Sequence, residues 1–206
     1  LPRALWRRRL PHRGWRMRLG RYPRGVRERL APLRGTLRAG PVWVHAVSVG
    51  EVAAIQPLLD PLAQRTSAPL VLSTVTSAGY AVATKHLGER GVVIYFPLDF
   101  RGCVRRALEA IRPRALLLVE LELWPTVIRL TRARRIPIAV VNGRISPRAF
   151  RRYRWVKPWL AGLLRRVDLC LMQSQADAER ILALGATPQR VRVTGSLKWD
   201  AGVGAR

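Results

Sequence analysis

The sequence predicts an α/β fold built on a Rossmann-like, doubly wound parallel sheet. From Pro41 onward, short apolar runs alternate with helical patterns of about 10–15 residues, which is the pattern of βαβ units. These runs are apolar at successive positions, as is typical of strands that are buried on both faces of a parallel sheet. With 206 residues, 49% of them hydrophobic, the chain is long enough for one large domain with a substantial core.

The predicted elements follow from this alternation, one strand and one helix at a time. We expect strands at 42–47, 70–74, 92–96, 115–119, 138–141, 169–172 and 191–194. We expect helices at about 51–65, 78–88, 101–111, 123–135, 147–166 and 175–184. The chain then divides into a basic arm (1–40), a Rossmann-like domain (41–195) and a segment (196–206) whose small residues are typical of a linker.

The charge of the chain is strongly one-sided. Lys and Arg together number 38 against 12 Asp and Glu, which gives a net charge of +26. In residues 1–40 the arginines alternate with Trp and Leu, and Glu28 is the lone acid. This mixture suits the interface of an anionic membrane surface, and it also suits contact with a nucleic-acid backbone. A solvated arm is the third interpretation.

Cysteine and histidine usage argues against several kinds of site. Cys103 and Cys170 suggest no disulfide framework, and two isolated thiols fit a reducing compartment. His12, His45 and His86 are too far apart for a zinc pattern. We therefore expect no metal and no cofactor.

The apolar runs are short compared with a membrane span. None reaches the roughly 18–20 residues that a spanning helix needs, and the beginning of the sequence has no signal-peptide pattern. Because the sequence starts with Leu1 rather than Met, we expect that a start, and with it an anchor, could precede it.

The segment 45–52 places an acid just after the first predicted strand. Ser48 and Gly50 belong to a predicted tight turn, and Glu51 lies in the first turn of the helix that follows. Ligands of open α/β sheets bind at the carboxyl ends of the strands. Glu51 is therefore a candidate general base, and the alternative is that it only complements the helix dipole or caps the helix.

Two further loops carry polar side chains at the same predicted edge. After the second strand, hydroxyls and backbone N–H groups at a helix start could form a cradle for an anion or a sugar, or only cap the helix; the residues are Thr74, Thr76, Ser77 and Gly79. Glu120 and Glu122 directly follow the apolar run 115–119. Acids in such a place are costly unless they are paired or functional, and helix capping by one of them is the alternative.

The last third of the chain contains a basic and aromatic stretch and a lone lysine. From Arg144 to Arg166 no acid occurs, and Trp155 and Trp159 lie among the basic residues. This stretch is the best candidate for a patch that docks on phosphate-bearing lipid, with a solvated face as the alternative. Lys198, just past the last predicted strand, could present a point charge to a carboxylate or phosphate.

Taken together, five segments resemble the motifs of the 3-deoxy-D-manno-octulosonic acid (Kdo) transferases, in the same order along the chain. They are residues 45–51, 120–125, 142–146, 173–177 and 195–200, so that the resemblance covers roughly residues 40–200. It implies a GT-B glycosyltransferase, with two Rossmann-like domains facing each other across a cleft. This chain would be the N-terminal, acceptor-side half.

The resemblance also implies an activity and a place for it. Such an enzyme transfers Kdo from CMP-Kdo to a lipid A precursor in lipopolysaccharide core biosynthesis, without a metal. It works at the cytoplasmic face of the bacterial inner membrane, as a peripheral or N-terminally anchored protein. Glu51 would be the base, and Glu120 and Lys198 would stabilise the transition state. The candidate acceptor-binding residues are Ser48, Gly50, Thr74, Thr76, Ser77, Gly79, Glu122 and Arg144.

The sequence departs from the family pattern at several positions. Leu121 and Gly143 replace the usual Thr and Ala, and Ser77-Ala78-Gly79 replaces a Pro-Thr-Gly. The C-terminal donor domain, which would bind CMP-Kdo, is missing, so we expect the chain alone to be inactive. The alternatives are an inactive fragment that only binds acceptor or membrane, a different GT-B enzyme, and a basic nucleic-acid-binding protein. The last rests on charge alone, and we expect no nucleic-acid partner.

Overall fold

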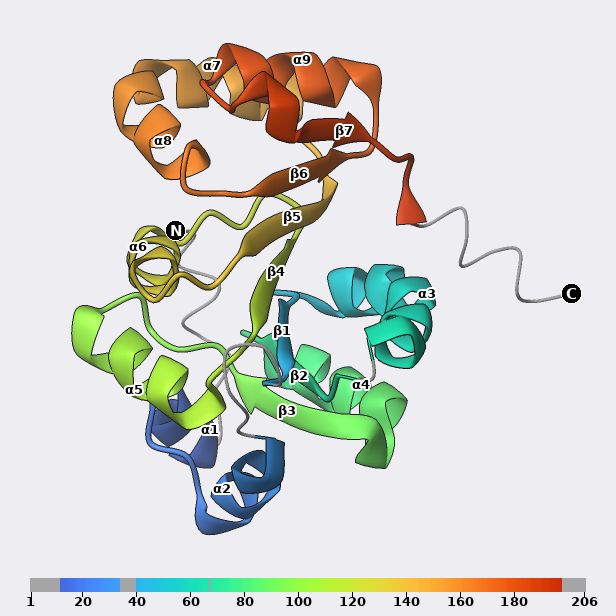
Figure 1. Ribbon diagram of the computed structural model, residues 1–206, viewed down its shortest axis with the longest axis vertical. Coiled ribbons are helices and arrows are strands. Elements are labelled where there is room, and N and C mark those ends of the chain that lie inside the picture. The colour runs from blue at the N-terminus through green and yellow to red at the C-terminus, as the bar shows by residue number, and fades with distance from the viewer. Residues whose placement is uncertain (1–11, 34–39, 67, 198–206) are drawn as a thin grey trace, which may run out of the picture.

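The computed structural model describes residues 12–33, 40–66 and 68–197, and for residues 12 and 13 only the backbone. Seven parallel strands form one sheet in the order β3-β2-β1-β4-β5-β6-β7 (Figure 1). The predicted parallel α/β fold is confirmed. The strands are β1 Val42–His45, β2 Leu70–Thr74, β3 Gly91–Tyr95, β4 Ala115–Val119, β5 Ile138–Gly143, β6 Leu169–Met172 and β7 Val191–Val193.

Two helices precede β1, and the others lie in the connections between strands. The helices are α1 His12–Arg18, α2 Arg24–Leu30, α3 Val49–Thr66, α4 Ser77–Leu87, α5 Arg101–Ile111, α6 Pro125–Ala133, α7 Pro147–Trp155, α8 Lys157–Leu164 and α9 Gln175–Ala183, and single 3₁₀ turns lie at Ala31–Leu33, Gly88–Arg90 and Pro188–Arg190. The helix predicted at 147–166 is wrong as a single element. It breaks at Val156, because Pro158 has no N–H and its ring would clash with the carbonyl of Arg154 in a continuous helix.

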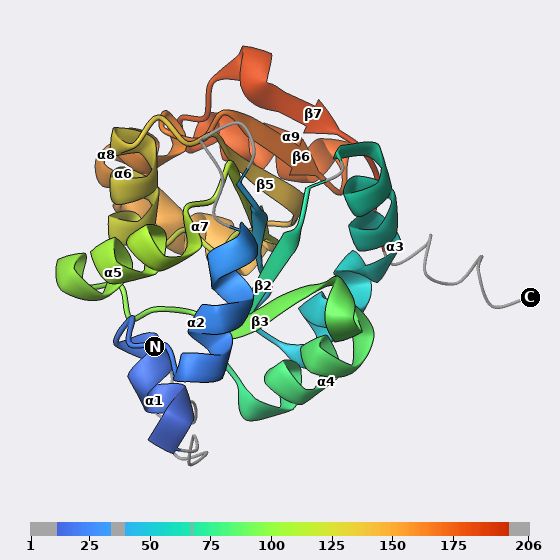
Figure 2. The same cartoon turned by 60° about the horizontal axis from the view of Figure 1, so that its bottom comes forward.

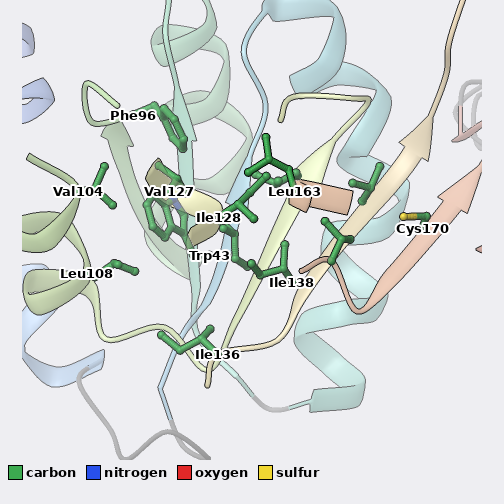
Figure 3. Close-up of a cluster of buried hydrophobic side chains, with 14 of the residues drawn as sticks. Trp43, Phe96, Val104, Leu108, Val127, Ile128, Ile136, Ile138, Leu163 and Cys170 are labelled. Carbon is green, nitrogen blue, oxygen red and sulfur yellow. The ribbon is translucent and has the colours of Figure 1, made fainter. Parts of the chain in front are cut away.

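The helices cover both faces of the sheet. Val42 and Val44 of β1 pack in a cluster with residues of α3 and α4, whereas Trp43 points into the cluster on the opposite face. That second cluster is lined by α5, α6 and α8, and Figure 3 shows Trp43 there with Phe96 and Ile128. Burial of side chains of this size contributes about 1.5–3 kcal/mol each. The core therefore lies on both sides of β1 and β4.

The described part of the predicted basic arm is packed against the domain. Helices α1 and α2 lie against β3, and α2 also contacts α5 (Figure 2). Met17, Tyr22 and Leu30 are buried there, and Arg106 of α5 donates to the carbonyl of Leu19. Buried side chains and a hydrogen bond therefore hold this part of the arm against the core.

Along the chain, strands are first added to the sheet on one side of β1 and then on the other side. The chain runs outward from β1 to β3, returns through α5, and then builds β4 to β7 on the other side of β1. The reversal makes the carboxyl ends of β1 and β4 the place where an open α/β sheet leaves a crevice for a ligand.

Within the described residues, no helix is both long and apolar enough to cross a membrane.

Candidate active site

Three carboxylates lie at the reversal point between β1 and β4. Glu51 follows β1, in the first turn of α3, and Glu120 and Glu122 follow β4. All three are partly buried. Parallel register pairs Val44 with Leu117 and His45 with Leu118, so the two strands end side by side. The sheet thereby brings together acids that are about 70 positions apart in the sequence.

Ser48 and Glu51 form a capping box at the start of α3. The Ser48 hydroxyl accepts the N–H of Glu51 (3.3 Å) and donates to Glu51 Oε1 (3.0 Å). Glu51 Oε2 accepts the N–H of Val47 (2.8 Å). The capping interpretation of Glu51 is thus confirmed, and the same bonds hold its carboxylate at the crevice.

The environment of Glu51 and Glu122 favours their protonated forms. Burial raises the pKa of Glu51, and the charge of Glu120 raises it further, whereas the bonds from Val47 and Ser48 lower it in part. Burial raises the pKa of Glu122 to about 7, with added repulsion from Glu51 and Glu120. For Glu51, desolvation therefore outweighs the hydrogen bonds that would lower its pKa.

The acids that follow β4 do not cap the next helix. The N-cap of α6 is Trp124, with no side-chain cap bond, and the orphan N–H groups of Thr126 (3.0 Å) and Val127 (2.9 Å) donate to Asp99 from the loop after β3. The capping alternative for Glu120 and Glu122 is therefore wrong. Asp99 thus takes the structural role at the start of α6 that the sequence could have assigned to Glu120 or Glu122.

Glu120 adopts an unusual backbone conformation. Its φ is +56°, in the left-handed region that residues other than Gly rarely adopt. Its N–H donates to the carbonyl of Val141 on the neighbouring strand (2.9 Å). Such strain, of order 1–3 kcal/mol, is retained mainly where the direction of a side chain matters.

The end of β2 and the start of α4 hold the loop after β1 in place. Thr74 is fully buried, and its hydroxyl donates to the carbonyl of Val47 (2.9 Å). Thr76 is the N-cap of α4 and accepts the N–H of Gly79 (3.0 Å). A Cβ on Gly79 would lie 2.5 Å from Thr74 Oγ1, so only Gly fits there. These three residues brace the loop that carries Ser48, and Ser77 is the member of the predicted cradle that is partly exposed at the helix start.

Of the remaining predicted residues, Gly50 lies beside Glu51, Arg144 lies farther along the edge, and Lys198 lies outside the described residues. Gly50 is exposed within α3 rather than in a tight turn, and a side chain there would meet only Ser48 Oγ, at 3.9 Å. The surface next to it is open to an approaching ligand. Arg144 is exposed in the loop after β5. Lys198 lies outside the described residues, directly after Leu197.

A pair of buried polar residues lies beneath the site, and the sequence did not predict its role. His45 and Ser73 are register partners on β1 and β2, and His45 Nδ1 lies 3.1 Å from both Ser73 Oγ and Ser73 O. The His45 ring stacks on Phe96 with 3.5 Å between centroids. Burial lowers the pKa of His45 to about 3, so the ring is neutral at pH 7. His45 supports the β1 loop, and the signal that could reveal it is a polar residue in the otherwise apolar strand β1, opposite the polar end of β2.

Among the residues that the structure describes, no group of three or more His, Cys, Asp or Glu side chains could hold a metal ion.

The arrangement as a whole suits proton transfer from a hydroxyl. It offers an anchored carboxylate with a raised pKa, a second acid that titrates near neutral pH, and open surface beside Gly50. A general base works best when its pKa is close to the operating pH.

Comparisons with known proteins point to one family. A family model described as "3-Deoxy-D-manno-octulosonic-acid transferase (kdotransferase)" matches residues 13–201. The chain is 38% identical over 200 residues to the 3-deoxy-D-manno-octulosonic acid transferase of Bordetella pertussis, covering 90% of this chain and 46% of that protein. It is 37% identical over 161 residues to a bifunctional glycosyltransferase/methyltransferase of Fusobacterium nucleatum, covering 77% of this chain and 25% of that protein. The chain thus spans less than half the length of these relatives.

A solved structure supports the fold. The UDP-GlcNAc 2-epimerase of Neisseria meningitidis superimposes with a TM-score of 0.56 at 12% identity, over 80% of this chain and 49% of the epimerase. At this identity the likeness shows the fold alone: a Rossmann-like half of the two-domain GT-B architecture.

Proposed function

Because the chain belongs to the Kdo transferase family, we propose that it supplies the acceptor-side domain and the catalytic base for transfer of Kdo from CMP-Kdo to a lipid A precursor. The observation that carries the proposal is the anchored Glu51 carboxylate at the β1–β4 crevice, with its pKa raised by burial. The donor would bind in the part of the relatives that this chain does not span.

The proposed step is a displacement at the anomeric carbon of Kdo. The acceptor hydroxyl oxygen forms a bond to that carbon, the bond from the carbon to the phosphate oxygen of CMP breaks, and Glu51 takes the hydroxyl proton. The N–H of Val47 and the hydroxyl of Ser48 donate to the two oxygens of Glu51, and a carboxylate has about four acceptor sites, so the acceptor hydroxyl can still donate to it. In this proposal Glu120 and Lys198 stabilise the charge that develops in the transition state.

The test is Glu51→Gln in the enzyme as the cell produces it, with transfer from CMP-Kdo to a lipid A precursor followed against pH. Loss of a general base lowers kcat by about 10²–10⁴-fold. Glu179→Gln, on the exposed face of α9, is the matched control and should leave the rate unchanged. Wild-type transfer by Glu51→Gln would exclude Glu51 as the base.

We further propose that the α7–α8 corner contacts the anionic membrane surface that holds the acceptor. Trp155 is 89% exposed and Trp159 50% exposed, far more than aromatic side chains usually are. Arg151 and Arg154 line a hollow of about 400 Å³ beside Trp155, and Lys157 is exposed next to them. Trp in the headgroup layer with basic residues against lipid phosphates is the usual composition of an interfacial contact.

Sedimentation with lipid vesicles tests this surface. Binding should require an anionic lipid such as phosphatidylglycerol, weaken with salt, and fall at least tenfold in Trp155→Ala/Trp159→Ala. Phe100→Ala is the matched control, because Phe100 is also exposed (68%) but lies in the loop before α5. Equal loss in the control, or equal binding to phosphatidylcholine vesicles, would exclude the corner as the contact.

A further inference from the structure

Arg18, in the last turn of α1, lies at the carboxyl edge of the sheet. Its carbonyl accepts the N–H of Leu98 (2.8 Å), which belongs to the loop that follows β3. The charge of Arg18 also acts on His45, the last residue of β1: burial is the main cause of the low pKa of His45, and the arginine lowers this pKa further. The guanidinium therefore lies within electrostatic range of the strand end from which the chain continues to Ser48 and Glu51.

Aromatic rings flank this position. The Cζ atom of Arg18 lies 5.7 Å from the centre of the Trp15 ring, within the range of a cation–π contact. On the side of the sheet, the His45 ring stacks on Phe96, and the Phe96 ring lies 5.3 Å from that of Trp124. Rings shield a guanidinium from water but leave the hydrogen bonds in its own plane unused.

Arg18 is partly buried and has no counter-ion among the residues that the structure describes. Its Nε is buried and finds no hydrogen-bond partner in this part of the chain, and none of the described ion pairs includes Arg18. Asp99, in the same loop after β3, accepts the N–H groups of Thr126 and Val127 instead. Burial accordingly lowers the pKa of Arg18. Taking a charge out of water is unfavourable unless an opposite charge is near.

The structural roles of two neighbouring arginines differ from this arrangement. Arg16 lies in the same last turn of α1 but is exposed, so it can interact with the helix end while it stays hydrated. Arg106 donates through Nε and Nη2 to the carbonyl of Leu19. Arg18 is desolvated without such a bond from its Nε. A guanidinium in this state suits a phosphate, because its planar fork of N–H groups matches two anionic oxygens.

We propose that Arg18 binds a phosphate group of the acceptor at the β1–β3 side of the crevice. The inference rests on the function proposed above, in which Glu51 deprotonates the acceptor hydroxyl. Arg18 comes from a helix on one face of the sheet and Glu51 from a helix on the other, since Met17 and Val52 belong to the two opposite core clusters. An acceptor that is held at both points presents its hydroxyl to the base in a fixed orientation.

The first test measures phosphate binding and needs no transfer. Inorganic phosphate is added to the enzyme as the cell produces it, and the ring signal of His45 is followed by NMR, because His45 senses the charge of Arg18. We expect a saturable shift in the wild type and in Arg16→Gln, the matched control on the exposed face of α1, and its loss in Arg18→Gln. The exposed His86 is the internal reference. Absence of a saturable shift in the wild type, or an equal one in Arg18→Gln, would overturn the proposal.

The second test measures transfer with two acceptors, the phosphorylated lipid and the same lipid without its phosphates. With the phosphorylated acceptor, Arg18→Gln should raise KM about tenfold to a hundredfold and change kcat little, because the contact is equal in the ground and transition states. Arg18→Lys keeps the charge without the fork and should fall between. With the dephosphorylated acceptor, Arg18→Gln should have no effect. An equal rise in KM for both acceptors means that Arg18 does not bind the phosphate.

A phospholipid headgroup is the alternative source of the phosphate. Transfer is therefore measured in micelles of a neutral detergent and again with phosphatidylglycerol vesicles. Dependence on Arg18 in both conditions supports the acceptor as the source, and dependence only with phosphatidylglycerol overturns the proposal.

The inference and the proposed function fail in different experiments. If Glu51→Gln transfers Kdo at the wild-type rate, the role of Glu51 is wrong, and the phosphate titration still decides whether Arg18 binds an anion. If Glu51→Gln is inactive and Arg18→Gln matches the wild type in phosphate binding and in KM, the proposed function stands and only the role of Arg18 is overturned.

Discussion

Replacing Glu122 by Gln should change the pH dependence of stability in a way that reports on the buried acids. Burial raises the pKa of Glu122 from 4.5 to about 7. The folded state then binds a proton at pH values where the unfolded state has released it. Stability contributed by this protonation is present below pH 4.5 and is lost as pH rises from about 4.5 to 7.

Gln has nearly the same shape as the protonated acid and does not titrate. The variant should therefore not lose this stability as the pH rises. The rise of the Glu122 pKa from 4.5 to about 7, at about 1.36 kcal/mol for each pH unit, gives an upper limit of about 3 kcal/mol. Because Glu122 is only partly buried, about 1–2 kcal/mol is the more realistic gain. We expect Glu122→Gln to match the wild type near pH 4.5 and to exceed its free energy of unfolding by this amount above pH 7.

Urea unfolding at several pH values between 4.5 and 7.5 measures the difference directly. Glu109→Gln is the matched control, because Glu109 is exposed on α5 in a pair with Arg105. The free energy of unfolding of this control should differ little from that of the wild type, and the difference should not grow with pH. If the difference for Glu122→Gln is flat across this range, Glu122 is ionised in the folded state and the desolvation argument for the acid cluster is wrong.

Two further predictions concern the loops that hold Glu51. Ser48→Ala removes the N-cap of α3 and should lower the free energy of unfolding by about 1 kcal/mol, seen as a lower urea midpoint. It also removes a bond that lowers the pKa of Glu51, so the acidic limb of the transfer rate should move to higher pH; an unmoved limb would mean that another group titrates. Gly79→Ala places a Cβ 2.5 Å from Thr74 Oγ1 and should destabilise by about 1–3 kcal/mol, with a lower thermal midpoint. Gly162→Ala in α8, where a Cβ meets nothing closer than 3.9 Å, should be neutral or stabilising, and equal midpoints for both variants would contradict the steric argument.

The fold was predictable because its signals are local. Each strand is a short apolar run, and each run is bounded by turn residues and followed by a helical pattern, so the order of the elements follows from the sequence. The missed break at Val156 was also local, since Pro158 disfavours a continuous helix there. The packing of α1 and α2 against β3 was not predictable, because Arg-rich segments with scattered Trp and Leu fit an exposed arm equally well.

The site was predictable only as a set of loops. Glu51, Glu120 and Glu122 follow strands, and the rule for open sheets brings such loops to one edge. Whether each carboxylate caps a helix or faces a ligand depends on contacts with residues far away in the sequence. Asp99, 27 residues before Thr126, caps α6 and so relieves Glu120 and Glu122 of that role. No spacing rule in the sequence connects those positions.

The balance of charges around the crevice explains why burial decides the pKa values there. The chain carries a net charge of +26, which by itself favours ionised carboxylates. Surface charges are screened over about 8 Å at physiological ionic strength, whereas desolvation acts directly on the carboxylate. The described ion pairs engage other acids, namely Glu28, Asp60, Glu109, Asp168 and Asp177, and none joins an arginine to Glu51, Glu120 or Glu122. A basic protein can therefore keep a proton acceptor of raised pKa at its sheet edge, provided that the arginines stay on the surface and the acids stay partly buried together.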